Sequence, residues 1–131
     1  MSALTDLYLQ INACRKCELS KLRTKAVPGE GAENASLMFI GEAPGYHEDQ
    51  QGRPFVGQAG QFLEKLLASI GLKREQVYIA NVIKCRPPDN RDPLPTEIQN
   101  CKPWLDRQIE LLKPQMIVTL GRYSMARYFP G

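Results

Sequence analysis

Leu37-Met38-Phe39-Ile40-Gly41-Glu42-Ala43-Pro44-Gly45 is the stretch that decides the fold of this chain. Its uncharged apolar start predicts a strand over residues 36–41 that is buried on both faces of a sheet. The strand breaks into a turn that carries a single carboxylate, Glu42, at the edge where open α/β sheets bind their ligands. Glu42 is therefore a candidate site residue, although an ordinary strand-to-loop turn with a solvated carboxylate explains the same residues.

The rest of the chain alternates between helix and strand patterns. Apolar runs predict two more buried strands over residues 77–83 and 116–120. The segments 18–35 and 46–57 are expected to be loops because they are polar or rich in glycine and proline. Apolar residues at helical spacing predict helices over 2–13, 58–70, from Thr96 to Pro114, and 122–128.

The ends of two of these helices carry their own signals. Gly71 is placed to cap the helix over 58–70. The sequence Thr96-Glu97-Ile98-Gln99 has the form of a capping box at the start of the following helix. Pro103 inside that helix predicts either a kink or a later start.

This alternation determines the expected architecture. Right-handed crossovers between buried strands predict a parallel sheet with helices on both faces. The expected fold class is therefore α/β, a three-layer α/β/α arrangement around a short parallel sheet. We expect residues 1–131 to form a single domain that is incomplete at its carboxyl end, because three strands make a small sheet and the last helix ends after barely two turns.

The composition is that of a globular domain, with 43% hydrophobic and 24% charged residues. No apolar run approaches the roughly 20 residues that span a membrane. The amino end lacks the basic start and long apolar stretch of a secretory signal. We therefore expect a cytoplasmic monomer without a membrane partner. The net charge of +3 permits a polyanionic partner without requiring one.

The cysteines form a spaced set. Cys14 and Cys17 make a C-x-x-C pair, and Cys85 and Cys101 follow with 15 residues between them. A reducing compartment disfavours structural disulfides. The remaining interpretations are a metal or cluster site, a redox pair, or four unrelated thiols.

Three polar or aromatic residues are expected to meet at one edge of the sheet. Parallel strands end at the same edge, so Glu42, Phe55 and Asn81 can share one crevice. An aromatic ring can stack on a nucleobase and an amide can hydrogen-bond to its Watson–Crick edge, so this set is suited to a nucleobase pocket. Alternatively, Phe55 is a loop anchor packed on the core, and Asn81 pairs with the backbone of a neighbouring loop.

The motifs around these residues resemble a known family. The stretches Gly41-Glu42-Ala43-Pro44-Gly45, Glu48-Asp49, Gly52-Arg53-Pro54-Phe55-Val56-Gly57 and Asn81-Val82-Ile83-Lys84-Cys85-Arg86-Pro87-Pro88 resemble those of the iron–sulfur (type four) uracil-DNA glycosylases. The similarity runs from about Cys14 to Gly121. It implies a uracil-DNA glycosylase-like fold, a DNA-repair enzyme that hydrolyses the N-glycosidic bond of uracil, and single- or double-stranded uracil-containing DNA as the partner.

The resemblance also implies a cofactor. It assigns Cys14, Cys17, Cys85 and Cys101 as ligands of a structural [4Fe–4S] cluster. Four thiolates suit zinc equally well by their chemistry alone. We expect the cluster to clamp the first helix and the 85–101 segment to the sheet.

The same resemblance assigns roles to the site residues. Glu42 would act near the sugar as the catalytic carboxylate. Phe55 would stack on the flipped uracil, and Asn81 would discriminate uracil from cytosine. Glu48 would help to block a thymine methyl group.

Backbone groups complete the uracil site that the resemblance implies. Gly41 lines it, and the amides around Glu42 and Ala43 would meet a uracil oxygen. The family also carries a His-Pro motif near its carboxyl end, which this sequence lacks; its one histidine, His47, is expected to be a solvated loop residue. The alternative function is therefore a non-catalytic iron–sulfur module that binds nucleic acid, or the chain is an inactive fragment.

Basic residues follow the first helix and flank Cys85. If the cysteines bring these segments together, the basic residues would form a patch able to meet phosphates; otherwise they are dispersed solubilising charges. The residues are Arg15, Lys16, Lys21, Arg23, Lys25, Lys84, Arg86 and Arg91.

Overall fold

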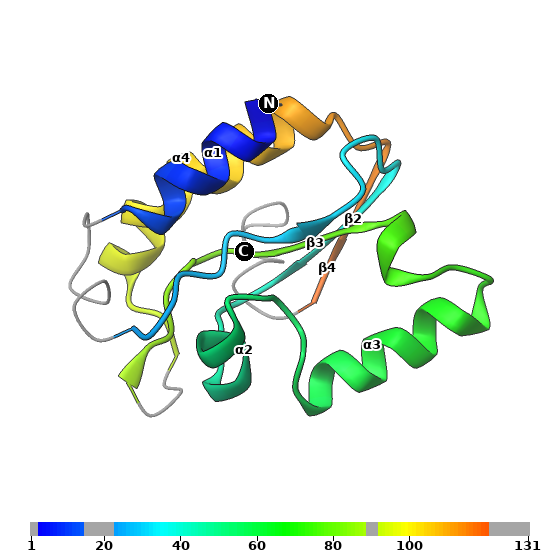
Figure 1. The fold of residues 1–131 in the computed structure, drawn as a ribbon, viewed down its shortest axis with the longest axis horizontal. Helices are drawn as coiled ribbons and strands as arrows, with labels where there is room; N and C mark the ends of the chain where they lie inside the picture. The colour runs from blue at the N-terminus through cyan, green and yellow to red at the C-terminus, as the bar shows by residue number, and fades with distance from the viewer. Residues whose placement is uncertain (1–2, 15–22, 89–91, 121–131) are drawn as a thin grey trace.

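The computed structural model describes residues 3–14, 23–88 and 92–120. Helices and strands alternate along the chain, as the sequence predicts, with one short 3₁₀ turn (Figure 1). The elements are α1 (Ala3–Asn12), β1 (Glu30–Gly31), β2 (Leu37–Gly41), α2 (Tyr46–Gln51), α3 (Gln58–Ser69), η2 (Arg74–Gln76), β3 (Tyr78–Asn81), α4 (Pro95–Leu112) and β4 (Met116–Thr119).

The sheet has the order β1-β3-β2-β4. β2 pairs in parallel with both β3 and β4, so the three predicted strands and their direction are confirmed. The fourth strand, β1, pairs antiparallel with β3 and was not predicted, because two residues are too short to show a hydrophobic period. Gly41 lies opposite Asn81 in the β2–β3 register, so these two strands end side by side.

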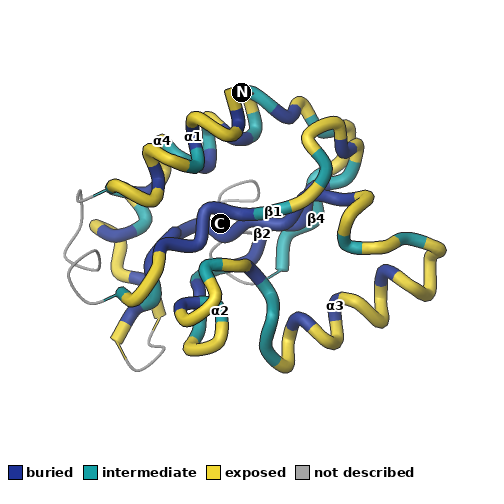
Figure 2. The backbone as a smooth tube through the Cα atoms, in the orientation of Figure 1, coloured by how far each residue is buried: buried dark blue, intermediate teal, exposed yellow. Residues whose placement is uncertain are grey.

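Helices cover both faces of the sheet, and the predicted three-layer arrangement is confirmed. In Figure 1, α1 and α4 lie together on one side of the strands, and α2 and α3 lie on the other. Alternate residues of β2 pack against the helices on opposite faces of the sheet, because successive strand side chains point to opposite faces. Met38 and Ile40 belong to the cluster with α1 and α4, whereas Phe39 packs with Leu63 and Leu67 of α3. β2 and β3 are buried along almost their whole length, whereas β1 and β4 are partly exposed, so the burial expected for the strand over 116–120 is not found. The helices are exposed on their outer sides (Figure 2).

The prediction that residues 46–57 form a loop is partly wrong. Tyr46–Gln51 is a short helix, α2, whose N-cap is Gly45. The backbone N–H of Gly45 donates to the carboxylate of Glu48 at 2.9 Å, which satisfies one N–H group at the helix start. The helix escaped prediction because six mostly polar residues carry no apolar stripe.

The start of α4 also differs from the prediction. The helix begins at Pro95, and the N–H of Leu94 donates to Glu97 Oε1 at 2.8 Å. The capping residues are therefore two positions earlier than the expected Thr96–Gln99 pair. The helix continues through Pro103, so a later start is wrong; burial of residues on both sides of the proline, including Cys101 and Leu105, favours the uninterrupted helix.

The apolar face expected for α3 is only partly buried. Leu63 and Leu67, four residues apart, contact the sheet, but Phe62, Leu66 and Ile70 remain exposed. A single i, i+4 row suffices to pack this helix on a small sheet, so the adjacent rows face outward. The glycine expected to cap this helix, Gly71, has the left-handed φ of 77° typical of that position.

Two other sequence predictions concern a helix near the carboxyl end and the absence of a membrane-spanning segment. The helix expected over 122–128 lies outside the described residues. Within the described parts of the chain, no helix combines the length and apolar character that a membrane crossing requires.

Candidate functional site

Gly41, Phe55 and Asn81 meet where β2 and β3 end. A Cβ atom built on Gly41 would lie 2.5 Å from both Asn81 Oδ1 and Phe55 Cζ. The missing side chain of Gly41 therefore lets the aromatic ring and the carboxamide converge on one point. The structure brings together these three residues from the sequence-predicted site, and the parallel register of β2 and β3 is the reason.

Phe55 packs on the core, as the loop-anchor interpretation expects, and it also lies at the strand end. Its ring is partly buried and packs against the cluster formed by Phe39, Leu63 and Leu67. The same ring reaches Gly41 at the strand end. Phe55 is therefore a loop anchor that also presents its ring beside Asn81.

Asn81 is held by its backbone and keeps its carboxamide for other partners. The residue is 2% exposed, and its carbonyl oxygen accepts a hydrogen bond from Lys84 Nζ at 2.8 Å. The ammonium also donates to Gln108 Oε1 at 2.7 Å, and Gln108 Nε2 donates to the Pro28 carbonyl at 2.6 Å. Among the described residues, no hydrogen bond to the Asn81 carboxamide is found.

Glu48 joins the loop after β2 to the loop that carries Phe55. Its carboxylate accepts hydrogen bonds from the backbone N–H groups of Gly45 at 2.9 Å, Val56 at 3.0 Å and Gly57 at 2.8 Å. Burial alone would raise the pKa of Glu48, but the N–H groups of Gly57, Gly45 and Val56 outweigh it, so the pKa is lowered from its ordinary value. The charged carboxylate is thus the form that braces the site.

Glu42 and Ala43 follow directly on the site glycine. The Glu42 carbonyl accepts the N–H of Ile83 at 3.1 Å, and the Gly41 carbonyl accepts the N–H of Val82 at 2.9 Å. These bonds continue the β2–β3 pairing beyond the strands, so the backbone at the carboxylate is fixed. Both residues are partly exposed, which leaves them accessible at the strand end.

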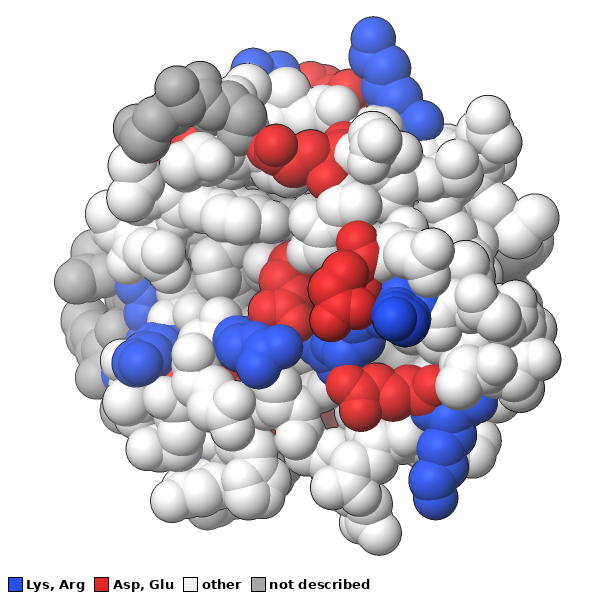
Figure 3. All heavy atoms as spheres, turned by 45° about the vertical axis from the view of Figure 1, so that its right-hand side comes forward, with Lys and Arg blue, Asp and Glu red and all other residues white. Residues whose placement is uncertain are grey.

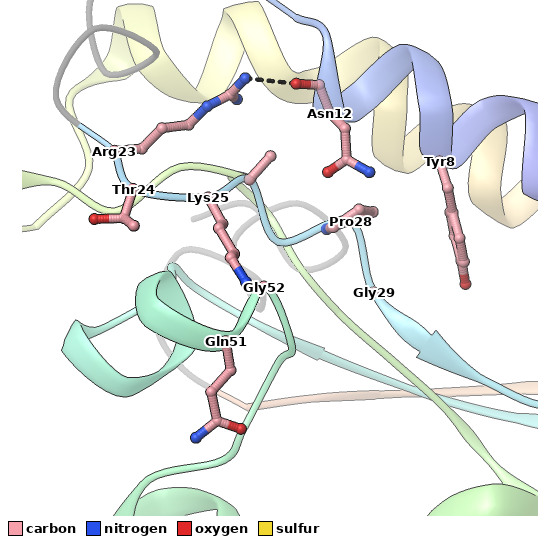
Figure 4. Close-up of a pocket in the computed structure, with 10 residues that line it drawn as sticks. Tyr8, Asn12, Arg23, Thr24, Lys25, Pro28, Gly29, Gln51 and Gly52 are labelled. Atoms are coloured by element: carbon pink, nitrogen blue, oxygen red, sulfur yellow. Dashed lines mark hydrogen bonds between the residues drawn. The ribbon is translucent and has the colours of Figure 1, made fainter.

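Two of the four candidate cysteines, Cys14 and Cys85, share the partner Arg23, and a third, Cys101, lies in the same part of the core as Cys85. Arg23 donates to Cys85 Sγ at 2.9 Å and to the Cys14 carbonyl at 3.1 Å, and it also contacts the Asn12 carbonyl (Figure 4). Cys101 and Cys85 belong to the same buried cluster. Trp104, one turn beyond Cys101 on α4, donates to Cys14 Sγ at 3.3 Å.

The segments that carry these three cysteines, namely the end of α1, the segment after β3, and α4, are thus joined by Arg23 and Trp104. Cys17 lies outside the described residues. Among the residues that are described, no group of three or more His, Cys, Asp or Glu side chains is arranged to hold a single metal ion.

A cavity of about 600 Å³ opens between α1, the segment before β1 and the end of α2. Tyr8, Asn12 and Arg23 are among its lining residues (Figure 4). Gly41 and Asn81 do not line it, so this cavity is separate from the predicted site.

The expected basic patch is corrected in part. Lys84 is 1% exposed and cannot contact phosphate, because its ammonium is buried against Asn81 and Gln108. Arg23 is engaged by Cys85 and by backbone carbonyls, whereas Lys25 is exposed. The face seen in Figure 3 carries interleaved acidic and basic side chains rather than one sign of charge. Arg15, Lys16, Lys21 and Arg91 lie outside the described residues.

His47 is exposed, as expected, but it belongs to α2 rather than to a loop. Its ring meets the Tyr46 ring edge-on at a centroid distance of 5.4 Å. The Arg86 guanidinium lies 5.5 Å from the centre of the same Tyr46 ring. A basic and two aromatic side chains therefore gather just after the ends of β2 and β3.

Sequence reasoning missed the residues that hold the site in place. Arg74 binds the carbonyls of Pro54 and Phe55, and Asp49, 3% exposed, accepts the N–H of Thr24 at 2.9 Å. Their partners lie at least 19 residues away along the chain, so no local pattern reveals them.

Comparisons with known proteins agree with this geometry. A sequence profile of the Uracil DNA glycosylase superfamily matches residues 28–131. The chain is 55% identical to a type-4 uracil-DNA glycosylase of Archaeoglobus fulgidus over 124 residues, which cover 95% of this chain and 62% of the relative. It is 53% identical to the type-4 protein of Sulfurisphaera tokodaii over 130 residues, or 98% and 59% of the two chains.

A type-4 protein of Thermotoga maritima is 46% identical over 122 residues, which are 93% of this chain and 64% of that protein. The chain therefore spans about three fifths of the length of these relatives. The profile match covers the strands and loops that carry Gly41, Phe55 and Asn81. The chain belongs to the uracil DNA glycosylase superfamily.

Proposed function

We propose that this chain is the base-recognition and catalytic part of a uracil-DNA glycosylase. It binds a uracil that has been flipped out of DNA, and it hydrolyses the bond between the base and the deoxyribose. The convergence of Gly41, Phe55 and Asn81 beside Glu42 is the observation that carries this proposal. The names of the type-4 relatives support it.

The proposed reaction separates charge, and the site residues match that separation. Water attacks C1′ of the sugar, the N-glycosidic bond breaks, and the uracil leaves with the bonding electron pair. Positive charge develops on the sugar and negative charge on the base, so a carboxylate from Glu42 and N–H donors near Ala43 stabilise the two parts. Flipping costs a few kcal/mol, which stacking on Phe55 offsets.

In this proposal, the Asn81 carboxamide distinguishes uracil from cytosine. A carboxamide offers one acceptor and two donor hydrogens, which complement the N–H and C=O edge of uracil but conflict with the amino group of cytosine. The rigid backbone of Asn81, bonded to Lys84, favours such discrimination. Glu48 remains the candidate for excluding a thymine methyl group, in addition to its observed bonds to Gly45, Val56 and Gly57.

We further propose that Cys14, Cys17, Cys85 and Cys101 hold a [4Fe–4S] cluster. Arg23, which bonds to both Cys85 and the Cys14 carbonyl, and Trp104, which bonds to Cys14 from the helix that carries Cys101, support this ligand set. Such a cluster supplies a covalent crosslink between distant segments rather than a reacting group. A brown protein with visible absorbance and bound iron is expected; a colourless protein that contains zinc would contradict the cluster.

Uracil release from single-stranded DNA tests the proposed activity. Strands that carry uracil, thymine or cytosine are incubated with the chain, and abasic sites are revealed by alkaline cleavage. We expect release of uracil alone. Glu42→Gln removes the charge that opposes the developing cation, so release should fall by about 10²-fold or more. Asn81→Ala should reduce uracil release and leave DNA binding largely unchanged.

Glu110→Gln is the matched control for the carboxylate, because Glu110 is exposed on α4 and pairs only with Arg107 in the described residues. It should release uracil at the wild-type rate. If the wild-type chain shifts uracil-containing DNA on a gel but releases no base, the chain is a binding module and the catalytic proposal is wrong.

A further inference from the structure

Arg74 holds the backbone of the loop that carries Phe55. Its guanidinium donates through Nη1 to the Phe55 carbonyl and through Nη2 to the Pro54 carbonyl, the latter at 2.6 Å. The Arg74 side chain is only 9% exposed. Hydrogen bonds from a charged, buried donor are stronger than neutral ones at the surface, so this contact restrains the loop effectively.

The loop needs such restraint because Phe55 has an unfavourable backbone conformation. Its φ is 52°, in the left-handed region that a bulky side chain rarely adopts. Such a conformation is strained and persists only where surrounding contacts enforce it. Gly60 also approaches this backbone closely, because a Cβ at this position would overlap the Phe55 carbonyl. Both Arg74 and Gly60 therefore lie against the strained backbone.

Arg74 is itself fixed by charged neighbours. Glu30 on β1 accepts a hydrogen bond from Arg74 Nη2 at 2.9 Å. The same carboxylate binds Arg53 in a bidentate pair, with both N–O distances at 2.8 Å. The hydrogen bond from Arg53 is the largest influence on Glu30; together with Arg74 it outweighs burial and lowers the pKa of the carboxyl. Glu64 lies farther away, at 3.8 Å from Arg74 Nε.

We propose that Arg74 is a positioning residue that orients the Phe55 ring for stacking on the flipped base. The inference rests on the proposed function, since Phe55 is the stacking residue in that proposal. Arg74 acts through the Pro54 and Phe55 carbonyls. The short strand β1 contributes to this positioning, because it places Glu30 where its carboxylate binds both Arg74 and Arg53.

The stacking itself can be measured without catalysis. Free uracil is titrated into the protein, and its H5 and H6 proton resonances are followed by NMR. A base that stacks on Phe55 experiences the ring current of the phenyl group, so both resonances should move upfield. Phe55→Ala defines the shift that remains without the ring.

Two substitutions of Arg74 separate its geometry from its charge. Arg74→Lys keeps the charge, but a single ammonium cannot reproduce the planar fork that bridges two carbonyls and Glu30. Arg74→Ala removes the side chain and creates a space that a guanidinium ion can fill. We expect both variants to lose the upfield shift to the level of Phe55→Ala. Uracil release should fall by about 10- to 100-fold, because mispositioned groups lose rates of this order.

Chemical rescue distinguishes positioning from general destabilisation. Millimolar guanidinium should restore the upfield shift and uracil release in Arg74→Ala, but not in Phe55→Ala. Arg107→Lys is the matched control, since Arg107 is exposed on α4 and pairs with Glu110 at 3.0 Å. It should behave as the wild type in every measurement.

The outcomes separate this inference from the proposed activity. Wild-type shifts in folded Arg74→Lys overturn the positioning role, and so does a failure of guanidinium to restore folded Arg74→Ala. If Arg74→Ala does not fold, Arg74→Lys alone decides by its shift. A wild-type chain that shows the uracil shift but releases no base contradicts the activity, and the shifts of the variants still judge the role of Arg74.

Discussion

Gly41→Ala is the substitution that the geometry constrains most directly. The new methyl group would lie 2.5 Å from Asn81 Oδ1 and from Phe55 Cζ, about 0.9 Å short of the 3.4 Å at which ordinary contact begins. Both atoms belong to side chains that would have to shift within a packed environment, because Asn81 is 2% exposed and the Phe55 ring packs against the cluster of Phe39, Leu63 and Leu67.

The size of the effect follows from this overlap. Overpacking of this kind costs about 1–3 kcal/mol of stability. A displacement near 1 Å in a reacting site costs about 10²-fold in rate, which corresponds to about 2.7 kcal/mol of barrier. We therefore expect Gly41→Ala to remain folded but to release uracil about 100 times more slowly than the wild type.

Single-turnover uracil release and thermal unfolding together provide the assay. Gly71→Ala is the control, because Gly71 also has no side chain but a Cβ there would meet nothing within 4 Å. Its φ of 77° makes the control somewhat less stable, by about 1 kcal/mol, without touching the site. Wild-type release by Gly41→Ala, or equal losses in both variants, would refute the assignment of this strand end as the base pocket.

Two further predictions concern the loops around the site. Because the pKa of Glu48 is lowered in the folded protein, its stabilising contribution is present above the ordinary value of 4.5 and is lost as the pH falls through the lower folded value. Glu48→Gln should therefore be less stable than the wild type at pH 7, with a difference that shrinks on acidification in denaturant titrations; a constant difference would contradict the charged brace. Gly60→Ala should gain about 1 kcal/mol of helix propensity but lose more to the overlap with the Phe55 carbonyl. Lower thermal stability and slower uracil release are expected, and a variant more stable than the wild type would show that the loop can move away.

The sequence alone predicted the layers and the meeting of Phe55 and Asn81 at the strand ends. Uncharged apolar runs and helical spacing are local signals, and they predicted β2, β3 and β4 together with α1, α3 and α4. The same runs fixed which edge of the sheet carries Glu42, Phe55 and Asn81, because parallel strands must end together.

The tertiary structure decided what holds those residues in place. Arg74 reaches Phe55 across 19 positions, and Lys84 meets Gln108 across 24, so neither contact leaves a periodic trace in the sequence. Lys84 shows most clearly what a local pattern cannot predict. A lysine in a polar loop is expected to be exposed to solvent, but in the folded chain Lys84 is buried and bonded to the Asn81 carbonyl. Local patterns specify which segments fold into which elements, whereas the partners of buried charges depend on how those elements are brought together in space.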